Sequence, residues 1–217
     1  MAEIEVYRHS IFYRMCHWAI VITGFILAFT GMQMAGLYGI RILEGQTLAV
    51  HITVSFVFGA LWFLMLYYII AKEWKWFGFG RIPYSIKFLI AEAKAWLGVG
   101  PHVKDPRGYN PDKKEYVEKI IPTEVMVWWI YFLLALLMGI TGLSMYYREF
   151  FKPVIDFAAS IAPAFGAYDG YTMLRAIHRF GMYLFGLILF MHIYAVLVFD
   201  VLPSMITGRR KEKVIRE

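Results

Sequence analysis

The chain is organised around four long stretches that contain no Asp, Glu, Lys or Arg. A helix needs about 20 mostly apolar residues to cross the hydrocarbon core of a bilayer, and the stretches meet that requirement. They occupy residues 15–40, 45–71, 125–147 and 180–199. With their flanking residues they predict membrane-spanning helices at 12–35, 47–71, 123–147 and 171–202, within a single membrane domain covering residues 1–217.

Composition supports an integral membrane protein. Hydrophobic residues make up 60% of the 217 positions and charged residues 18%, whereas a soluble domain has about 45–50% and about 25%. The connection at 72–122 contains a segment, 82–97, that mixes aromatic and aliphatic residues with three charges, which is typical of a helix lying on a membrane surface. We therefore predict an all-α, four-helix membrane bundle with an amphipathic helix between the second and third spans.

The cationic residues indicate the orientation of the spans. The segment 72–119 holds ten Lys and Arg, the tail after Thr207 holds five, and the N-terminal arm adds two. By the positive-inside rule, both termini and the 72–122 loop face the cytoplasm. The net charge of +6 is then explained by topology and anionic lipid rather than by nucleic acid. The other two connections hold only Arg41, Arg148 and Lys152.

Weaker patterns mark the remaining connections. Residues 98–114 are polar and contain three prolines, so we predict a loop there. The connection at 151–170 is moderately apolar, and it predicts a short surface helix at about 154–161.

Four of the six histidines lie within strongly apolar stretches: His17, His51, His178 and His192. An imidazole at membrane depth is costly unless its nitrogens are satisfied. His178 and His192 are fourteen residues apart, which is about four helical turns, so both project from one helix face roughly 21 Å apart. A lone membrane histidine is more often a hydrogen-bonding residue or a proton relay, but four at matched depths favour metal ligation.

The alternating direction of the spans sorts these histidines into pairs. His51 lies near the start of a span that enters the membrane from the outside, so it is at the depth of His178. His17 lies near the start of a span that enters from the inside, so it is at the depth of His192. We therefore predict two b-type haems, the outer one held by His51 and His178 and the inner one by His17 and His192. The single cysteine and the lack of a CxxCH motif exclude covalent haem attachment and an iron–sulfur cluster held by this chain alone.

Three arginines at helix ends near these histidines could pair with haem propionates. Each could equally anchor its helix at the interface by extending its charged end to water. Glycines that recur near the histidines would leave room for a macrocycle, or would allow close helix contact. The three arginines are Arg14, Arg175 and Arg179.

Several of these residues carry a family resemblance. The sequence from Arg14 to Trp18 resembles the R-x-x-H-W signature of the cytochrome b (gamma) subunit of membrane-bound formate dehydrogenases. That group belongs with the cytochrome b subunits of nickel–iron hydrogenases and thiosulfate reductases. The spacing of His178 and His192 is similar to the family's ligand pair, and the dipeptides 30–31 and 141–142, both Thr-Gly, look like family positions.

The resemblance implies a role in electron transfer. An outer catalytic subunit would oxidise the primary substrate, an iron–sulfur subunit would pass electrons to the outer haem, and the inner haem would reduce a quinone, usually menaquinone, near the cytoplasmic face of a prokaryotic inner membrane. Against the family's quinone segment, Tyr109, Asn110 and Lys114 match, whereas Gly108 and Lys113 depart.

The residues of this segment also have chemistry of their own. An amide such as Asn110 can donate to a quinone oxygen and accept from a quinol hydroxyl, although a turn before Pro111 is an alternative role. His102 is a candidate proton carrier, because its ordinary pKa is near neutral, or simply a solvated loop residue.

Other functions are compatible with parts of this pattern. The same architecture could serve a hydrogenase, or oxidise quinol for a terminal reductase, because another chain handles the primary substrate. A metal-ion or proton transporter would use histidines as transient ligands, but it predicts acidic residues within the spans, and the four charge-free stretches have none. A membrane anchor without redox function has no use for four depth-matched imidazoles.

Overall fold

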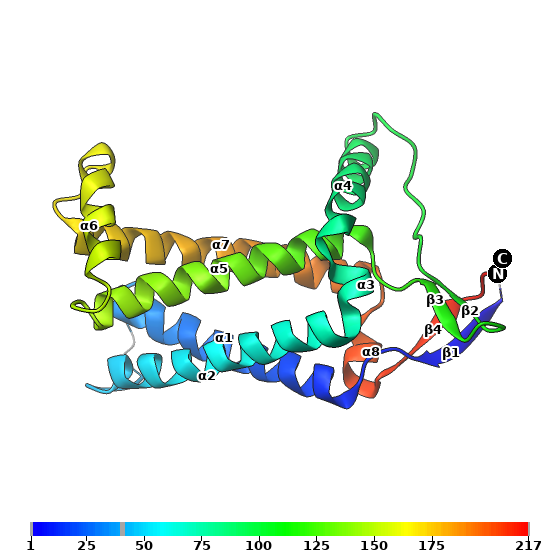
Figure 1. The fold of residues 1–217 in the computed structure, drawn as a ribbon, viewed down its shortest axis with the longest axis horizontal. Coiled ribbons are helices and arrows are strands. Elements are labelled where there is room, and N and C mark those ends of the chain that lie inside the picture. The colour runs from blue at the N-terminus through cyan, green and yellow to red at the C-terminus, as the bar shows by residue number, and fades with distance from the viewer. Residues whose placement is uncertain (1, 40–41, 217) are drawn as a thin grey trace. The chain divides into compact units, whose positions relative to one another are not determined.

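The computed structural model describes residues 2–39 and 42–216, so Arg41 lies outside the described residues. Within them, four helices are long and apolar enough to cross a membrane (Figure 1). This confirms the predicted all-α class of a membrane helical bundle. The four are α1 (Ile11–Met34), α2 (Thr47–Tyr68), α5 (Pro122–Tyr146) and α7 (Gly170–Val198).

Helix boundaries follow local chemistry. Pro122 begins α5, where a missing backbone N–H costs nothing because that group has no partner within the helix. Beyond the end of α1, Gly36 adopts a φ of +70°, a left-handed conformation that glycine adopts readily, and the N–H of Leu37 then donates to Met32 O at 3.0 Å. The first charge-free stretch, 15–40, extends beyond the end of α1 because the residues after Met34 are also mostly apolar.

The chain forms two compact units. The first contains the residues up to Ala19, Phe63–Ile130 and the residues from His192 onward, and the second contains Ile20–Trp62 and Tyr131–Met191. Each of the four long helices contributes residues to both units. His17 and His192 belong to the first unit, whereas His51 and His178 belong to the second.

In the first unit, the connection between α2 and α5 is mostly ordered into short elements. A π-helical turn (Ile69–Glu73), α3 (Trp74–Phe77) and a 3-10 turn (Phe79–Arg81) lead into α4 (Ile82–Trp96). A helix is thus present where one was predicted at 82–97, and its place on the membrane surface stays a prediction.

The residues predicted as loop at 98–114 are only partly irregular. Gly108–Asn110 forms β2, which pairs with β3 (Glu115–Glu118). The reason is a side-chain hydrogen bond: Asn110 Oδ1 accepts from the backbone N–H groups of Asp112 and Lys113, at 3.0 Å each, and closes the turn between the strands.

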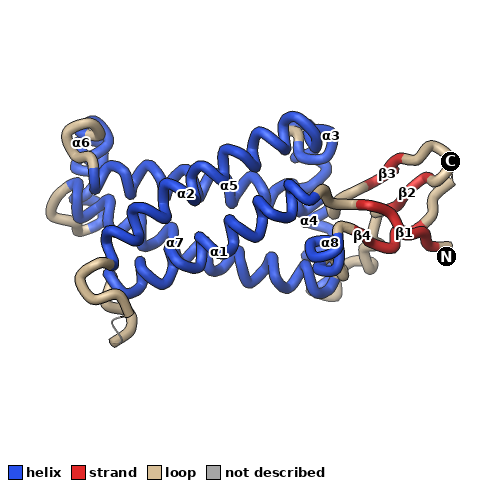
Figure 2. The backbone as a smooth tube through the Cα atoms, turned by 90° about the horizontal axis from the view of Figure 1, so that it is seen from below, coloured by secondary structure: helices blue, strands red, loops and turns tan. Residues whose placement is uncertain are grey.

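The termini of the chain also form strands, which the all-helical prediction omitted. β1 (Glu3–Tyr7) pairs antiparallel with β4 (Arg209–Lys213), from Glu3 opposite Lys213 to Tyr7 opposite Arg209. A parallel bridge between Tyr109 and Val214 joins β2 to the C-terminal tail. Figure 2 shows these strands gathered beside both termini. The N-terminal arm, the 72–122 connection and the tail are therefore parts of one structure, together with α8 (Leu202–Thr207).

The second unit includes α6 (Lys152–Ile161) and the 3-10 turn Ala162–Phe165, close to the surface helix predicted at 154–161. A small hydrophobic cluster between α6 and α7 contains Ala158, Ala162, Met173 and Leu174. Gly170 opens α7 against α6, and a Cβ there would lie 2.2 Å from Ile155 O. Only glycine allows this approach, which holds α6 across the start of α7 (Figure 1).

Candidate functional site

In the second unit, the rings of His51 and His178 face one another from α2 and α7. Their centroids are 6.4 Å apart and their planes make an angle of 66°. Each Nδ1 is held by a threonine: Thr30 Oγ1 lies 2.8 Å from His51 Nδ1, and Thr141 Oγ1 lies 2.8 Å from His178 Nδ1. The Nε2 atoms are thus the nitrogens that remain for a metal.

A glycine follows each of these threonines and faces the same imidazole. A Cβ built on Gly31 would lie 3.5 Å from His51 Cε1, and one on Gly142 would lie 3.4 Å from His178 Cε1. These are ordinary contact distances, so a methyl group would touch the ring and a larger side chain would displace it. Each of the two Thr-Gly dipeptides therefore contacts one histidine ring, and the two sets of contacts are alike.

In the first unit, His17 on α1 and His192 on α7 form a second pair, with ring centroids 6.3 Å apart and an interplanar angle of 46°. Trp18 packs edge-on against His17 at 5.5 Å and donates from Nε1 to Met205 O of α8 at 3.1 Å. His17 Nδ1 is buried and has no hydrogen-bond partner. This pair therefore lacks, on His17, the threonine contact seen in the other pair.

Both pairs have the separation that a bis-imidazole metal requires. A metal–imidazole bond of about 2.0–2.1 Å, with about 1.2 Å from ring nitrogen to centroid, places two opposed centroids about 6.4 Å apart. The observed values are 6.3 and 6.4 Å. The described residues contain no group of three or more His, Cys, Asp or Glu able to share a metal ion. Each pair therefore fits a metal whose other ligands come from a macrocycle, such as haem.

The three arginines predicted near propionates lie close to these pairs in sequence. Arg14, three residues before His17, donates from Nη1 to Ile206 O, and its Nε is buried without a partner. Arg175 and Arg179 are exposed on α7, on either side of His178. An apolar groove of about 450 Å³ runs beside Arg14, lined by Ile11, Arg14, Met15, Trp18, Met205 and Ile206.

The four residues predicted to contact quinone lie on β2, in the turn that follows it and in the connection that precedes it. Tyr109 and Asn110 are neighbours on β2, where Tyr109 packs on Tyr116 at 5.2 Å and Asn110 closes the turn through its Oδ1. Lys114 is exposed in the turn, at a φ of +53°. His102 is exposed in the connection between α4 and β2. The turn role considered for Asn110 is thus present in the structure.

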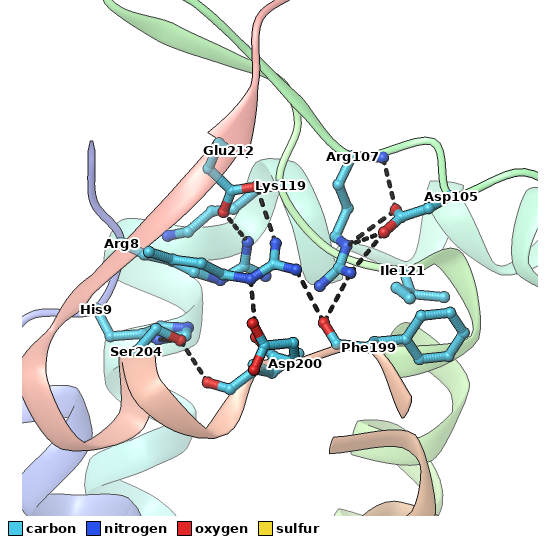
Figure 3. Close-up of polar contacts among 12 residues, drawn as sticks. Arg8, His9, Asp105, Arg107, Lys119, Ile121, Phe199, Asp200, Ser204 and Glu212 are labelled. Atoms are coloured by element: carbon cyan, nitrogen blue, oxygen red, sulfur yellow. Dashed lines mark hydrogen bonds and ion pairs between the residues drawn. The ribbon is translucent and has the colours of Figure 1, made fainter. Parts of the chain in front are cut away.

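A buried network of charges in the first unit was not predicted (Figure 3). Arg8 Nη1 pairs with Glu212 at 2.7 Å, and their side chains are 0% and 1% exposed. Glu212 also accepts from Arg210 at 2.9 Å. Arg107 pairs with Asp105, and its guanidinium overcomes the effect of burial to hold the pKa of that carboxyl below its usual value.

This network fastens the C-terminal end of α7. Arg107 and Arg210 both donate to Phe199 O, at 3.1 and 2.8 Å, and Arg210 also donates to Asp200 O at 3.0 Å. These carbonyls have no partner within the helix, and cations are favoured at a helix C-terminus. Phe199, whose carbonyl both arginines bind, lies seven residues after His192. Sequence reasoning missed the network because its members come from three distant segments.

Comparison with known proteins places the chain in a family. No curated protein matches it. The model of the prokaryotic cytochrome b561 family, however, matches residues 8–208, which include all four membrane-spanning helices and both histidine pairs. The chain therefore belongs to the prokaryotic cytochrome b561 family of haem b-binding, multi-pass membrane proteins that transfer electrons.

Proposed function

We propose that this protein is a dihaem membrane subunit that carries electrons from an outer iron–sulfur partner to a quinone near the cytoplasmic face. The observation that carries the proposal is the pair of bis-histidine sites. Two histidines from different helices face one another in each unit, at nearly equal separations. A transporter that binds metal transiently has no need for two such matched, two-ligand sites.

The roles of the residues follow from this arrangement. His51 and His178 hold the outer haem, and His17 and His192 hold the inner haem. Haem held by these histidines would supply one-electron chemistry. The chain contributes ligand orientation, an apolar surrounding and arginines for the propionates: Arg14 at the inner site, and Arg175 and Arg179 at the outer site.

The orientation in the membrane rests on charge. The N-terminal arm, the 72–122 connection and the C-terminal tail carry most of the Lys and Arg, and they are joined through β1–β4 pairing and the Tyr109–Val214 bridge. We infer that this assembly faces the cytoplasm. The His17/His192 pair, which belongs to the same unit, is then the inner pair.

The quinone headgroup is best accommodated beside the inner pair. Trp18 lines the groove between α1 and α8 and contacts the ring of His17, so one wall of the groove packs against the inner ligand. Its walls are apolar, as an isoprenoid quinone requires, and Arg14 supplies a hydrogen-bond donor. Contacts from Tyr109, Asn110, Lys114 and His102 stay a prediction, with the amide oxygen of Asn110 already engaged in its turn.

The partners follow from the family resemblance at residues 14–18. We propose an iron–sulfur subunit and an outer catalytic subunit of the formate dehydrogenase type, because the R-x-x-H-W sequence resembles that group. Co-purification of the natural complex tests this assignment. A nickel–iron hydrogenase, or a terminal reductase whose quinol is oxidised here, would replace it if found instead.

A reduced-minus-oxidised optical spectrum of the purified protein tests the core of the proposal. We expect b-type bands and about two haems per polypeptide, since every iron takes two histidines. His178→Ala should remove one haem. His9→Gln, a control at a histidine outside the spans, should retain both. A colourless, correctly assembled protein would favour a transporter or an anchor and would end the proposal.

A further inference from the structure

Two threonines contact the outer histidine pair in the same way, although they lie on different helices. Thr30 on α1 and Thr141 on α5 each place Oγ1 2.8 Å from a histidine Nδ1. Each also lies 2.7 Å from the carbonyl oxygen four residues earlier, that of Ile26 or Leu137. Both distances are the same at the two threonines, so each histidine of the outer pair has the same hydrogen-bond arrangement.

The direction of these hydrogen bonds follows from which groups carry a hydrogen. A threonine hydroxyl carries one hydrogen, and a backbone carbonyl can only accept. The hydroxyl therefore donates to the carbonyl of its own helix, and its oxygen accepts from the histidine Nδ1–H. A neutral imidazole protonated at Nδ1 has its lone pair at Nε2, the atom that can bind a metal. Each threonine thus selects the tautomer that ligation requires.

We propose that Thr30 and Thr141 are positioning residues that lower the reduction potential of the haem held by His51 and His178. This rests on the proposed function. A hydrogen-bond acceptor at Nδ1 makes an imidazole a stronger electron donor to its metal. The ferric state gains more from this donation than the ferrous state, and hydrogen bonding around the ligands is one of the means by which a protein sets a haem potential.

The inner pair provides the contrast. His17 Nδ1 is buried without a partner, so no hydroxyl strengthens that imidazole as a donor. The contacts of Thr30 and Thr141 therefore distinguish both ligands of the outer haem from His17 of the inner haem. The side chains around the ligands, rather than the ligands themselves, make this difference.

Potentiometric titration of threonine variants tests the inference, best in a His192→Ala background, where only the outer haem is expected. Thr30→Val and Thr141→Val keep the shape of the side chain and remove the hydroxyl. We expect each to raise the midpoint potential, the double variant to raise it further, and Thr→Ser at either position to return it toward the parent value. Ferric electron paramagnetic resonance should show altered ligand-field splitting in the Val variants only.

Ser144→Ala is the matched control. Ser144 is fully buried on α5, three residues after Thr141, and donates to Ile140 O at 2.6 Å. Removal of this hydroxyl should leave the midpoint potential of the outer haem unchanged, because a hydrogen bond to a backbone carbonyl alone does not act on a haem ligand. An equal shift in Ser144→Ala, or no shift in the Val variants, would overturn the inference.

Loss of haem is also informative. If a Val variant loses the outer haem while Thr→Ser keeps it at the parent potential, the hydroxyl is required and the inference stands. If Val and Ser both lose the haem, side-chain shape rather than hydrogen bonding is responsible, and the inference fails. A parent protein that binds no haem would defeat the proposed function itself, whereas an unshifted potential in haem-loaded variants defeats only the threonine role.

Discussion

Replacing Glu212 by Gln should destabilise the first unit strongly. Glu212 is the carboxylate that Arg8 and Arg210 share, and it is only 1% exposed. Arg8 Nε and Nη2 already lack partners, so the substitution leaves a buried guanidinium with no compensating charge. Arg210 loses less, because it keeps its bonds to Phe199 O and Asp200 O.

The expected size follows from the burial. Removing one partner of a buried ion pair costs about 3–5 kcal/mol, and we expect about 4 kcal/mol because the amide oxygen of Gln can still accept one bond. A chain of this length loses about 2–4 °C in midpoint per kcal/mol, so the unfolding midpoint should fall by about 8–16 °C. Replacing Arg8 by Met together with Glu212 by Leu should recover more than half of this loss, since no unpaired charge then remains at Arg8.

The assay can use the single cysteine. Cys16 is 5% exposed and belongs to the first unit, so a maleimide dye should react with it only when that unit opens. Asp112→Asn is the control, because Asp112 pairs with Arg216 at 3.6 Å on the surface of the same unit, where a pair contributes at most about 1 kcal/mol. A midpoint for Glu212→Gln no lower than that of the control would refute the reasoning.

Three further predictions concern the sites and pH. His192→Ala should remove the inner haem spectrum and block quinone reduction, while the outer haem stays reducible; loss of both signals without misfolding would contradict the pairing. Gly142→Ala should keep the outer haem, since its methyl group would just touch the ring of His178, whereas Gly142→Val should lose it selectively, as quantified by haem content. Burial, with the charge of Arg8, holds the pKa of His9 well below its usual value. On acidification the unfolded state therefore binds a proton at His9 before the folded state does. The free energy of unfolding then has its full value above about pH 6.5 and decreases below that pH. His9→Gln should flatten that decline in the thiol assay, normalised to free cysteine at each pH, and an unchanged decline would exclude His9.

The sequence predicted the helices well because their determinants are local. A membrane-spanning segment must satisfy its backbone hydrogen bonds internally, so length and absence of charge are enough to locate it. The same holds for α4, which was predicted at 82–97 and is found at Ile82–Trp96. The pairing of the four histidines needed only their spacing and the alternating direction of the spans, and the structure places His17 with His192 and His51 with His178. Their role as haem ligands stays a proposal.

What surrounds those histidines was decided only by tertiary structure. The Thr30–His51 and Thr141–His178 bonds join residues 21 and 37 positions apart, and they depend on the rotation of one helix against another. Arg8 meets Glu212 across 204 positions, in a network that forms only when both ends of the chain pair as strands. Hydrophobic periodicity reports which face of a segment is buried. It does not report which polar group lies opposite on the neighbouring segment, because those contacts form only when distant parts of the chain pack together.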